Sequence, residues 1–493
     1  MTDTHALAPG RNCWRIETAD KASVIIDAEG YFRIARQAML AAKHQILLIG
    51  WDFDARIKLV HEPQDGAPAQ VGAFIDWLLA RKPGLQVYIL RWDMGALKTL
   101  FRGRTILTLI RWVFKRRIHL KLDSAHPTGA SHHQKIIVVD DCLAFCGGID
   151  MTDDRWDTRA HRDHDPERVG VGGKPYKPWH DATTALAGPV AAALGDLSRE
   201  RWRRAGGSPI APPPATATCW PEALPVDFAD VTVAVSRTQP EMPGIAEVHE
   251  IETLYLDLIA RAERWIYAES QYFASRKVAE AIARRLEEPD GPEIVILNPE
   301  TSQGWLEPIA MDTARARLIE AIRPHDRHGR LRVYHPCTAA GAPVYVHAKV
   351  TVIDGRILRV GSSNFNNRSM RLDTECDVTI DATRAGNEDA AGRIAGIAHG
   401  LIAEHLGVEP EVVARRLAET GSLIATIEGL CGPGRSLRLY ETPQLDGLQE
   451  WLADNEILDP ESPEEMFSPL AKRGLLRRLG ARFSRRGAPA SRQ

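Results

Sequence analysis

Two segments of the chain carry the same polar residues at the same offsets, and this doubling restricts the folds that the chain can adopt. In each copy a histidine and a lysine stand two residues apart, an aspartate follows, and a glycine turn leads to an Asp or Asn. The first copy consists of His133, Lys135, Asp140, Gly148 and Asp150, and the second of His347, Lys349, Asp354, Ser362 and Asn364. The chain therefore contains two related halves, each supplying part of one candidate site.

A histidine and a lysine two residues apart lie on one face of a strand, because successive side chains point to opposite faces. Their imidazole and ammonium groups then project into the same space. The runs that follow, residues 136–139 and 350–353, are β-branched and almost wholly apolar, as is typical of strands buried on both faces. A single His-x-Lys would more often be a core histidine beside a surface lysine, but two copies at identical offsets favour a functional site.

The doubled pattern, H-x-K-x4-D followed by a glycine turn, resembles the signature of the phospholipase D superfamily. Further segments are similar to eukaryotic-type phospholipases D, and they comprise residues 154–157, 179–181, 269–273, 361–369 and 404–407. The resemblance implies a phosphodiesterase that hydrolyses a phospholipid, such as phosphatidylcholine or phosphatidylethanolamine, to phosphatidic acid and free headgroup. The reaction would pass through a phosphohistidine, with transphosphatidylation as a further activity.

Two other activities of the same superfamily are alternatives: a cardiolipin synthase-like phosphatidyltransferase and a nuclease. Cardiolipin synthases usually carry N-terminal membrane spans, and nucleases of the family are commonly short chains with one motif that dimerise. A chain of 493 residues holding both motifs and no long apolar run fits neither description well. A catalytically silent lipid-binding module would be signalled by a lost histidine or lysine, and both copies keep theirs.

Hydrophobic periodicity predicts an α/β fold with two homologous α/β/α sandwich halves and mixed sheets. The predicted helices are residues 31–43 and 251–263, and the predicted strands, besides those after the motifs, are 46–51, 85–90, 118–122, 265–268, 293–297 and 331–334. The resemblance implies that the two sheets pack about a pseudo-twofold axis, with the active site at their interface.

The chain divides into four predicted parts. Residues 1–203 form the first phospholipase D-like half, and the Pro- and Gly-rich residues 204–230 form a linker. Residues 231–407 form the second half, and residues 408–493 form a helical C-terminal extension with a basic amphipathic tail. Because both motifs lie in one chain, we expect a monomer.

The residue types suit phosphodiester cleavage. A neutral imidazole can attack phosphorus, and a second, protonated imidazole can give the leaving alkoxide its proton. Lys135 and Lys349 can offset the charge on the nonbridging oxygens, and Asn364 and Asp150 are assigned to the phosphate site. By resemblance His133 is the nucleophile and His347 the general acid, although the two roles are interchangeable from the sequence.

Carboxylates are expected to support the two histidines. In the family a carboxylate downstream of the glycine turn orients the nucleophile, and Glu375 matches it in the second half, with Asp157 as the candidate in the first. Asp140 and Asp354 belong to the catalytic motif of the family. Their position at the turn after each strand predicts instead that they bind backbone amides.

No cofactor is required by this chemistry. An acidic segment could bind Ca²⁺, and its residues are Asp153, Asp154, Asp163 and Asp165. Their spacing is not that of a known calcium loop, so a solvated loop is the favoured interpretation. His180 is expected to be structural. The seven cysteines follow no disulfide framework and are expected to be reduced, with Cys142 and Cys146 as buried small residues.

The expected partner is a phospholipid membrane surface. Leu475, Leu479 and Phe483 are spaced four apart within the basic segment 470–486, as in an interfacial helix on anionic lipid. A disordered basic terminus is the alternative. The formal net charge of -3 gives no general attraction to nucleic acid. Without a recognisable signal peptide or transmembrane segment we expect a cytoplasmic or peripheral membrane protein, with signal-independent secretion left open.

Overall fold

The computed structural model describes residues 5–93, 104–216, 219–303 and 311–442. Their strands form one large mixed sheet and, beside it, the short parallel pair β7 and β14. Among the helices of these residues, none is both long enough and apolar enough to cross a membrane.

Strands and helices alternate along the first half. Its elements are β1 Arg15–Ile26, α1 Ala28–Ala41, β2 Gln45–Gly50, α2 Val71–Arg81, β3 Gln86–Trp92, α4 Arg104–Val113, β4 Ile118–Asp123, β5 Ile136–Val139, β6 Leu143–Gly147, β7 Trp179–His180, β8 Ala182–Ala187 and α5 Pro189–Arg204. The helix and the four strands predicted here are confirmed within a few residues as α1, β2, β3, β4 and β5.

The second half repeats this alternation. Its elements are β9 Phe228–Gln239, β10 Val248–His249, α6 Glu250–Arg261, β11 Trp265–Glu269, α7 Arg276–Glu287, β12 Glu293–Leu297, α8 Thr313–Ile322, β13 Leu331–Cys337, β14 Tyr345–Val346, β15 Val350–Ile353, β16 Ile357–Gly361, β17 Glu375–Asp381 and α9 Ala391–Leu406. The predicted helix and strands are confirmed as α6, β11, β12, β13 and β15.

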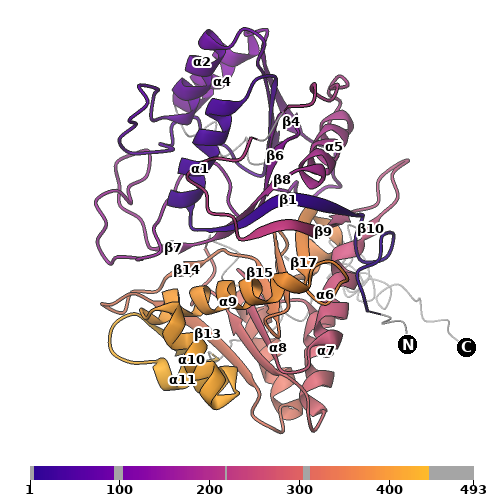
Figure 1. The fold of residues 1–493 in the computed structure, drawn as a ribbon, viewed down its shortest axis with the longest axis vertical. Helices are drawn as coiled ribbons and strands as arrows, with labels where there is room; N and C mark the ends of the chain where they lie inside the picture. Colours follow the sequence, from indigo (N-terminus) through magenta and orange to yellow (C-terminus); the bar gives the residue numbers. More distant parts are fainter. Residues whose placement is uncertain (1–4, 94–103, 217–218, 304–310, 443–493) are drawn as a thin grey trace, which may run out of the picture.

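Strands β1 and β9, twelve residues each, form the central antiparallel pair of the sheet (Figure 1). Outward from β1 the order is β8, β6, β5, β2, β3 and β4, and outward from β9 it is β17, β16, β15, β11, β12 and β13. Both series are antiparallel near the centre and continue into three parallel strands, β2, β3 and β4 or β11, β12 and β13. The two separate sheets implied by the resemblance are therefore one continuous sheet, because β1 and β9 pair along most of their length.

Helices cover both faces of the sheet in each half. Apolar residues of α1 and α2 pack on one face of the first half, and those of α6 and α7 on one face of the second. A third cluster packs α5 and α9 against the sheet and continues from one half into the other through β1, β9 and β17. Burial of this shared apolar surface, at about 25 cal/mol per Å², joins the halves into one body.

Local sequence explains where several helices begin and end. Pro189 opens α5, where its fixed φ suits the first turn and its missing N–H costs no hydrogen bond. The Ser275 side chain accepts a hydrogen bond from Val278 N and caps α7. Gly407 follows α9 with φ 65°, a left-handed conformation that glycine adopts without strain.

The predicted linker is more ordered than its composition indicates. β9 begins at Phe228, inside residues 204–230, and the preceding segment folds back over the first half, where Ala211 O accepts from Gln45 Nε2 at 3.1 Å. Cys219 forms a disulfide with Cys142. The expectation of seven reduced cysteines is wrong for this pair, because the fold brings together two residues separated by 77 positions.

The C-terminal extension is described as far as residue 442. It contains α10 Pro410–Thr420 and α11 Leu423–Leu430, followed by β18 Ser436–Leu439, which pairs antiparallel with β13 at the edge of the sheet. The extension is thus not wholly helical. The basic tail predicted at 470–486 lies outside the described residues.

Candidate active site

The two His-x-Lys segments lie side by side where the halves meet. Each stands in an extended stretch directly ahead of its strand, β5 or β15, and not within it as the sequence pattern predicted. His133 N donates to Thr374 O at 3.0 Å, and His347 N donates to His180 O at 2.8 Å. The backbone of each motif histidine is therefore held by the opposite half of the chain.

The side chains are held in the same crossed manner. Nδ1 of His133 lies 2.9 Å from both carboxylate oxygens of Glu375, a residue of the second half. Nδ1 of His347 lies 2.7 Å from Oδ2 of Asp181, a residue of the first half. With Nδ1–H donating to a carboxylate, Nε2 of each ring is the nitrogen that can attack or transfer a proton.

Asp181 and Glu375 occupy equivalent places in the sheet. Gly148 N donates to Ala182 O, and the equivalent Ser362 N donates to Cys376 O. Asp181 directly precedes the first of these acceptors, and Glu375 directly precedes the second. A Cβ atom at Gly148 would lie 2.2 Å from Oδ1 of Asp181. The absence of a side chain at Gly148 therefore makes room for Asp181, whereas the Ser362 hydroxyl donates to Glu375.

The assignment of Asp157 as the histidine-orienting residue of the first half is wrong. Its carboxylate accepts from Trp179 N at 2.8 Å, lies 3.1 Å from Nδ1 of His161 and pairs with Arg168. Asp157 lies closer to the first motif in sequence, but the fold places Asp181 against the ring of His347. The sequence signal for this role is the Trp179-His180-Asp181 segment, which resembles the family and contains the aspartate directly after the histidine.

The motif lysines are fixed by short contacts. Lys135 Nζ donates to His133 O at 2.9 Å and lies 3.2 Å from Oδ2 of Asp150. Lys349 Nζ donates to His347 O and contacts Gln271 Oε1 at 3.5 Å. Each ammonium group is thereby folded back beside its own histidine.

Asp150 and Asn364 are equivalent but act differently. Asp150 pairs with Lys135 and accepts from Trp51 N at 3.0 Å, so its place in the phosphate site is corrected to that of a lysine-positioning group. A carboxylate in direct contact with a phosphodiester would repel it. The Asn364 side-chain oxygen accepts from Gln271 N at 3.2 Å, and its amide group is the part that can donate to a substrate oxygen.

Asp140 and Asp354 bind backbone amides, as their position at the turns predicted. Asp140 accepts from three consecutive amides, those of Lys43, His44 and Gln45, at 2.6–2.9 Å. Asp354 accepts from the equivalent amides of Glu263, Arg264 and Trp265 at 2.7–2.8 Å. Both aspartates fix the start of the neighbouring strand, β2 or β11, and their carboxylates bind these amides and not a motif histidine, so their catalytic assignment is corrected to a scaffold role.

Aromatic and cationic side chains line the His347 side of the site. The Trp179 ring lies 5.1 Å from the His347 ring and stacks on Tyr345 at 4.6 Å. The Arg155 guanidinium lies 4.2 Å from the centre of the Trp179 ring. Sequence reasoning did not single out Arg155, which adds a third cation to the electrostatic field of the site.

Burial and positive charge favour the neutral form of both motif imidazoles in the free protein. Burial, followed by the charges of Lys135 and Lys349, lowers the pKa of His133 well below its ordinary value. Burial, Lys349 and Arg155 do the same to the pKa of His347. Burial also lowers the pKa of Lys349 to about 7, although Asp181 opposes the change. A neutral imidazole beside cations is suited to attack an anionic phosphodiester.

The acidic segment considered for Ca²⁺ does not gather around one point. Asp163 accepts from the Thr338 hydroxyl and from Ala340 N, whereas Asp153 accepts from Val171 N. Among the described residues, the groups with metal-ligand geometry lie elsewhere: Asp27, His161, His180 and Glu404, and the adjoining His180, Glu269 and His405.

Comparisons with known proteins agree with this geometry. The family model described as phospholipase D matches residues 38–241, and the one described as cardiolipin synthase, PLD-like domain, matches residues 255–391. Phospholipase D alpha 1 of Carica papaya is 23% identical, with 75% of this chain and 63% of the relative covered. Phospholipase D alpha 2 of rice, Oryza sativa subsp. japonica, is 24% identical, with 77% and 64% covered. The chain thus spans less than two thirds of the length of these relatives.

The fold is also found in a solved structure. Phosphatidylserine synthase of Haemophilus influenzae Rd KW20 superposes with a TM-score of 0.52 at 15% identity, covering 83% of this chain and 94% of that one. One family model lies on each half of the chain, and each contains one copy of the doubled motif. Taken with the paired histidines, these matches show that the chain belongs to the phospholipase D superfamily.

Proposed function

We propose that the protein is a phospholipase D-type phosphodiesterase, which hydrolyses a phospholipid to phosphatidic acid and free headgroup. The observation that carries the proposal is the crossed pair of carboxylate–histidine contacts, Glu375 to His133 and Asp181 to His347. Two oriented imidazoles beside two lysines supply a nucleophile, a proton donor and charge stabilisation.

In the proposed first step Nε2 of His133 attacks phosphorus and the bond to the headgroup oxygen breaks. The leaving alkoxide takes a proton from His347. Entry of the anionic substrate raises the affinity of this imidazole for a proton, because an opposite charge stabilises the imidazolium. Lys135, Lys349 and the Asn364 amide stabilise the nonbridging oxygens. In the second step His347 removes a proton from water, which attacks the phosphohistidine and releases phosphatidic acid.

Product analysis tests this reaction. Purified protein is incubated with vesicles of phosphatidylcholine or phosphatidylethanolamine, with and without a primary alcohol. We expect phosphatidic acid with choline or ethanolamine, and a phosphatidyl alcohol when the alcohol is present. Release of diacylglycerol with phosphocholine would contradict the proposal, because that reaction breaks the other ester bond.

A phosphatidyltransferase is the second candidate, favoured by the description of the family model that matches residues 255–391. Both activities share the first step and differ in whether water or a lipid alcohol receives the phosphatidyl group. The same assay distinguishes them when phosphatidylglycerol is offered. Formation of cardiolipin without phosphatidic acid would favour the transferase.

The roles of the two histidines are tested with an activated substrate. A bis-aryl phosphodiester has a leaving group that needs no proton, so His347→Ala should still form the phosphohistidine but hydrolyse it slowly. We expect a stoichiometric burst of phenolate from this variant, with an acid-labile phosphate adduct on His133 found by mass spectrometry. His133→Ala should give no burst. The reverse pattern would exchange the two roles.

A further inference from the structure

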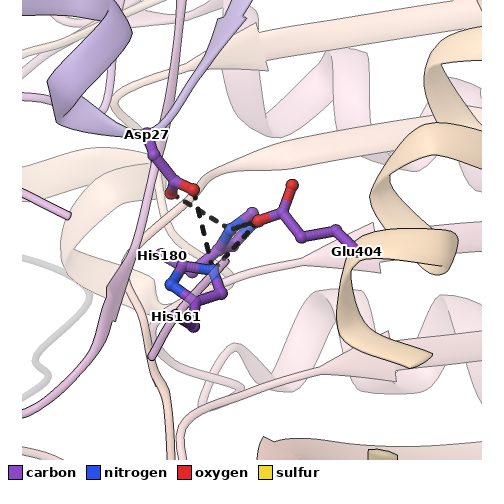
Figure 2. A group of neighbouring side chains, drawn as sticks. All are labelled: Asp27, His161, His180 and Glu404. Carbon is purple, nitrogen blue, oxygen red and sulfur yellow. Dashed lines mark hydrogen bonds and ion pairs between the residues drawn. The ribbon is translucent and has the colours of Figure 1, made fainter. Parts of the chain in front are cut away.

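A second cluster of ionisable side chains lies beside the catalytic pair without belonging to it. Asp27, His161, His180 and Glu404 converge from four separate segments, as Figure 2 shows. Their potential ligand atoms all lie within 4.8 Å of one another, and no residue of the four is more than 5% exposed. Three of them come from the first half, and Glu404 comes from α9 in the second.

We infer that these four residues form a closed binding site for a divalent transition metal of the zinc class. The proposed ligands are His161 Nε2, His180 Nδ1, an oxygen of Asp27 and Oε1 of Glu404. Two imidazoles and two carboxylates make a donor set that suits zinc, whereas Ca²⁺ and Mg²⁺ prefer oxygen donors alone.

Four contacts between the imidazoles and the carboxylates, at 2.9–3.6 Å, have lengths close to the donor separations of a tetrahedral metal site. Oε1 of Glu404 lies 3.0 Å from His161 Nε2 and 2.9 Å from His180 Nδ1. Oδ1 of Asp27 lies 3.3 Å from His180 Nδ1, and Oδ2 of the same carboxylate lies 3.6 Å from His161 Nε2. Ligands at the usual zinc distances stand about 3.3 Å apart in a tetrahedron. The donor atoms of the four residues, all within 4.8 Å of one another, are therefore close enough to share one metal ion.

An independent observation comes from Asp27. Its Oδ2 atom is buried, has no hydrogen-bond partner among the described residues, and faces His161 within the cluster. Asp27 also adopts φ 64° and ψ 156°, a backbone conformation that is costly for residues other than glycine. A buried carboxylate oxygen that faces the cluster and accepts no hydrogen bond is available as a metal ligand.

Further carboxylates and an arginine hold the ligands from outside. Asp157 Oδ2 lies 3.1 Å from Nδ1 of His161, and Glu269 Oε2 lies 2.9 Å from Nε2 of His180. Arg159, half-exposed, donates to the second oxygen of Glu404. Histidine ligands of metals commonly donate their other N–H to a carboxylate in this way.

The charges of the cluster also favour a divalent cation. Four buried carboxylates, of Asp27, Asp157, Glu269 and Glu404, are opposed by two guanidinium groups, of Arg159 and Arg168. With neutral imidazoles two negative charges remain, which a divalent cation would offset. Protonation of both imidazoles is the competing arrangement, and it would produce an ion-pair network without metal.

The site adjoins Asp181, the residue that positions His347. Asp27 N donates to Asp181 O at 2.8 Å, and Asp181 N donates to Asp27 Oδ1 at 3.1 Å. A metal on Asp27 and His180 would restrain the backbone that carries Asp181, and with it the orientation of His347. The four protein ligands leave no open position for substrate, so the role is structural.

Metal binding to the full chain tests the inference. Protein dialysed against a chelator is mixed with one equivalent of Zn²⁺ and passed over a desalting column, and its metal content is measured. We expect about one zinc per chain and a rise in melting temperature. His161→Gln and Glu404→Gln should bind zinc at least tenfold more weakly, and Asp157→Asn about tenfold more weakly through its effect on His161. His335→Gln, a buried histidine outside the cluster, is the matched control.

Two further measurements keep the test decisive. Asp27→Asn retains an oxygen for the Asp181 amide, so it serves if the histidine variants fail to fold. A crystal grown with zinc should show an anomalous peak in contact with His161 and His180. Failure of the wild-type protein to retain zinc, equal retention by Asp27→Asn, or a peak confined to other residues would overturn the inference and leave a protonated ion-pair network.

Discussion

The role of Asp181 follows from its contact with His347, and the sequence alone did not predict it. It holds Nδ1 of His347 at 2.7 Å and is fully buried. Asp181→Asn keeps the size of the side chain but removes the negative charge and favours the wrong imidazole tautomer. We expect kcat on a water-soluble phosphodiester to fall by about 10²–10⁴-fold, as for other carboxylate–histidine pairs.

Asp157→Asn is the comparison, because the sequence pattern gave that residue the same role. Asp157 contacts His161 and not a motif histidine, so with zinc in excess the variant should retain more than a tenth of the activity when melting temperatures are matched. An equal loss in both variants would show that the Asp181 contact is not specific to catalysis.

The lowered pKa of Lys349 predicts that the activity falls at alkaline pH. Burial lowers its pKa to about 7, so in the free protein the side chain loses its charge as the pH rises through 7. The neutral form cannot stabilise phosphate charge, and kcat/KM should therefore decline about tenfold per pH unit well above that value. The pKa of His133 lies well below 6.5, which places the acidic decline below pH 6.5.

Lys349→Arg tests whether the loss of charge on Lys349 causes the alkaline decline in kcat/KM. A guanidinium stays protonated throughout the range, so the alkaline decline should move upward or disappear even if the maximal rate is lower. An unchanged alkaline limb in this variant would assign the titration to another group.

Residues that the sequence identified belong to local patterns, whereas those that it missed make contacts with residues distant along the chain. The histidines, lysines and amide-binding aspartates follow from a local pattern, because their offsets are fixed within one turn and one strand. The partners of the histidines lie in opposite halves, so no spacing within one half could pair Asp181 with His347. The disulfide between Cys142 and Cys219 was missed because the two residues are separated by 77 positions and no cysteine spacing pairs them.

At the ends of strands β6 and β16, Gly148 and Ser362 mark the asymmetry between the halves. Gly148→Ser would place its Cβ atom 2.2 Å from Oδ1 of Asp181, so Asp181 must shift away from His347. We expect a loss of at least tenfold in kcat and a destabilisation of about 1–3 kcal/mol from overpacking. Gly172→Ser is the control, because nothing lies within 4 Å of its added Cβ. Normal kinetics in Gly148→Ser would mean that Asp181 tolerates displacement.

Strands were easiest to predict where the sequence is uniformly apolar. β5 and β15 follow from their β-branched runs, and the parallel strands follow from alternation with helices. The central strands β1 and β9 were not predicted, because their polar and apolar residues mix and their partner is distant along the chain. The sequence therefore predicted one helix and several strands of each half, but not the pairing of β1 with β9 that joins the two halves into one sheet.

For the molecule as a whole, the continuous sheet makes the two halves interdependent. β1 pairs with β9 and His133 depends on Glu375, so neither half contains a complete site. Access to lipid is a separate question, since the described residues include no membrane-spanning helix. We propose that the basic tail, which lies outside the described residues, supplies the membrane contact.

Truncation after Pro469 tests that proposal. Each Lys or Arg near an anionic surface contributes about 1 kcal/mol, and the apolar residues Leu475, Leu479 and Phe483 add more. The truncated protein should sediment far less with anionic vesicles at low salt, while the full chain should lose binding as salt rises. Turnover of a short-chain, water-soluble phosphodiester should be unchanged, because every proposed catalytic group precedes residue 443. Equal sedimentation of the two proteins would exclude the tail as the membrane anchor and direct attention to the surface around the active site.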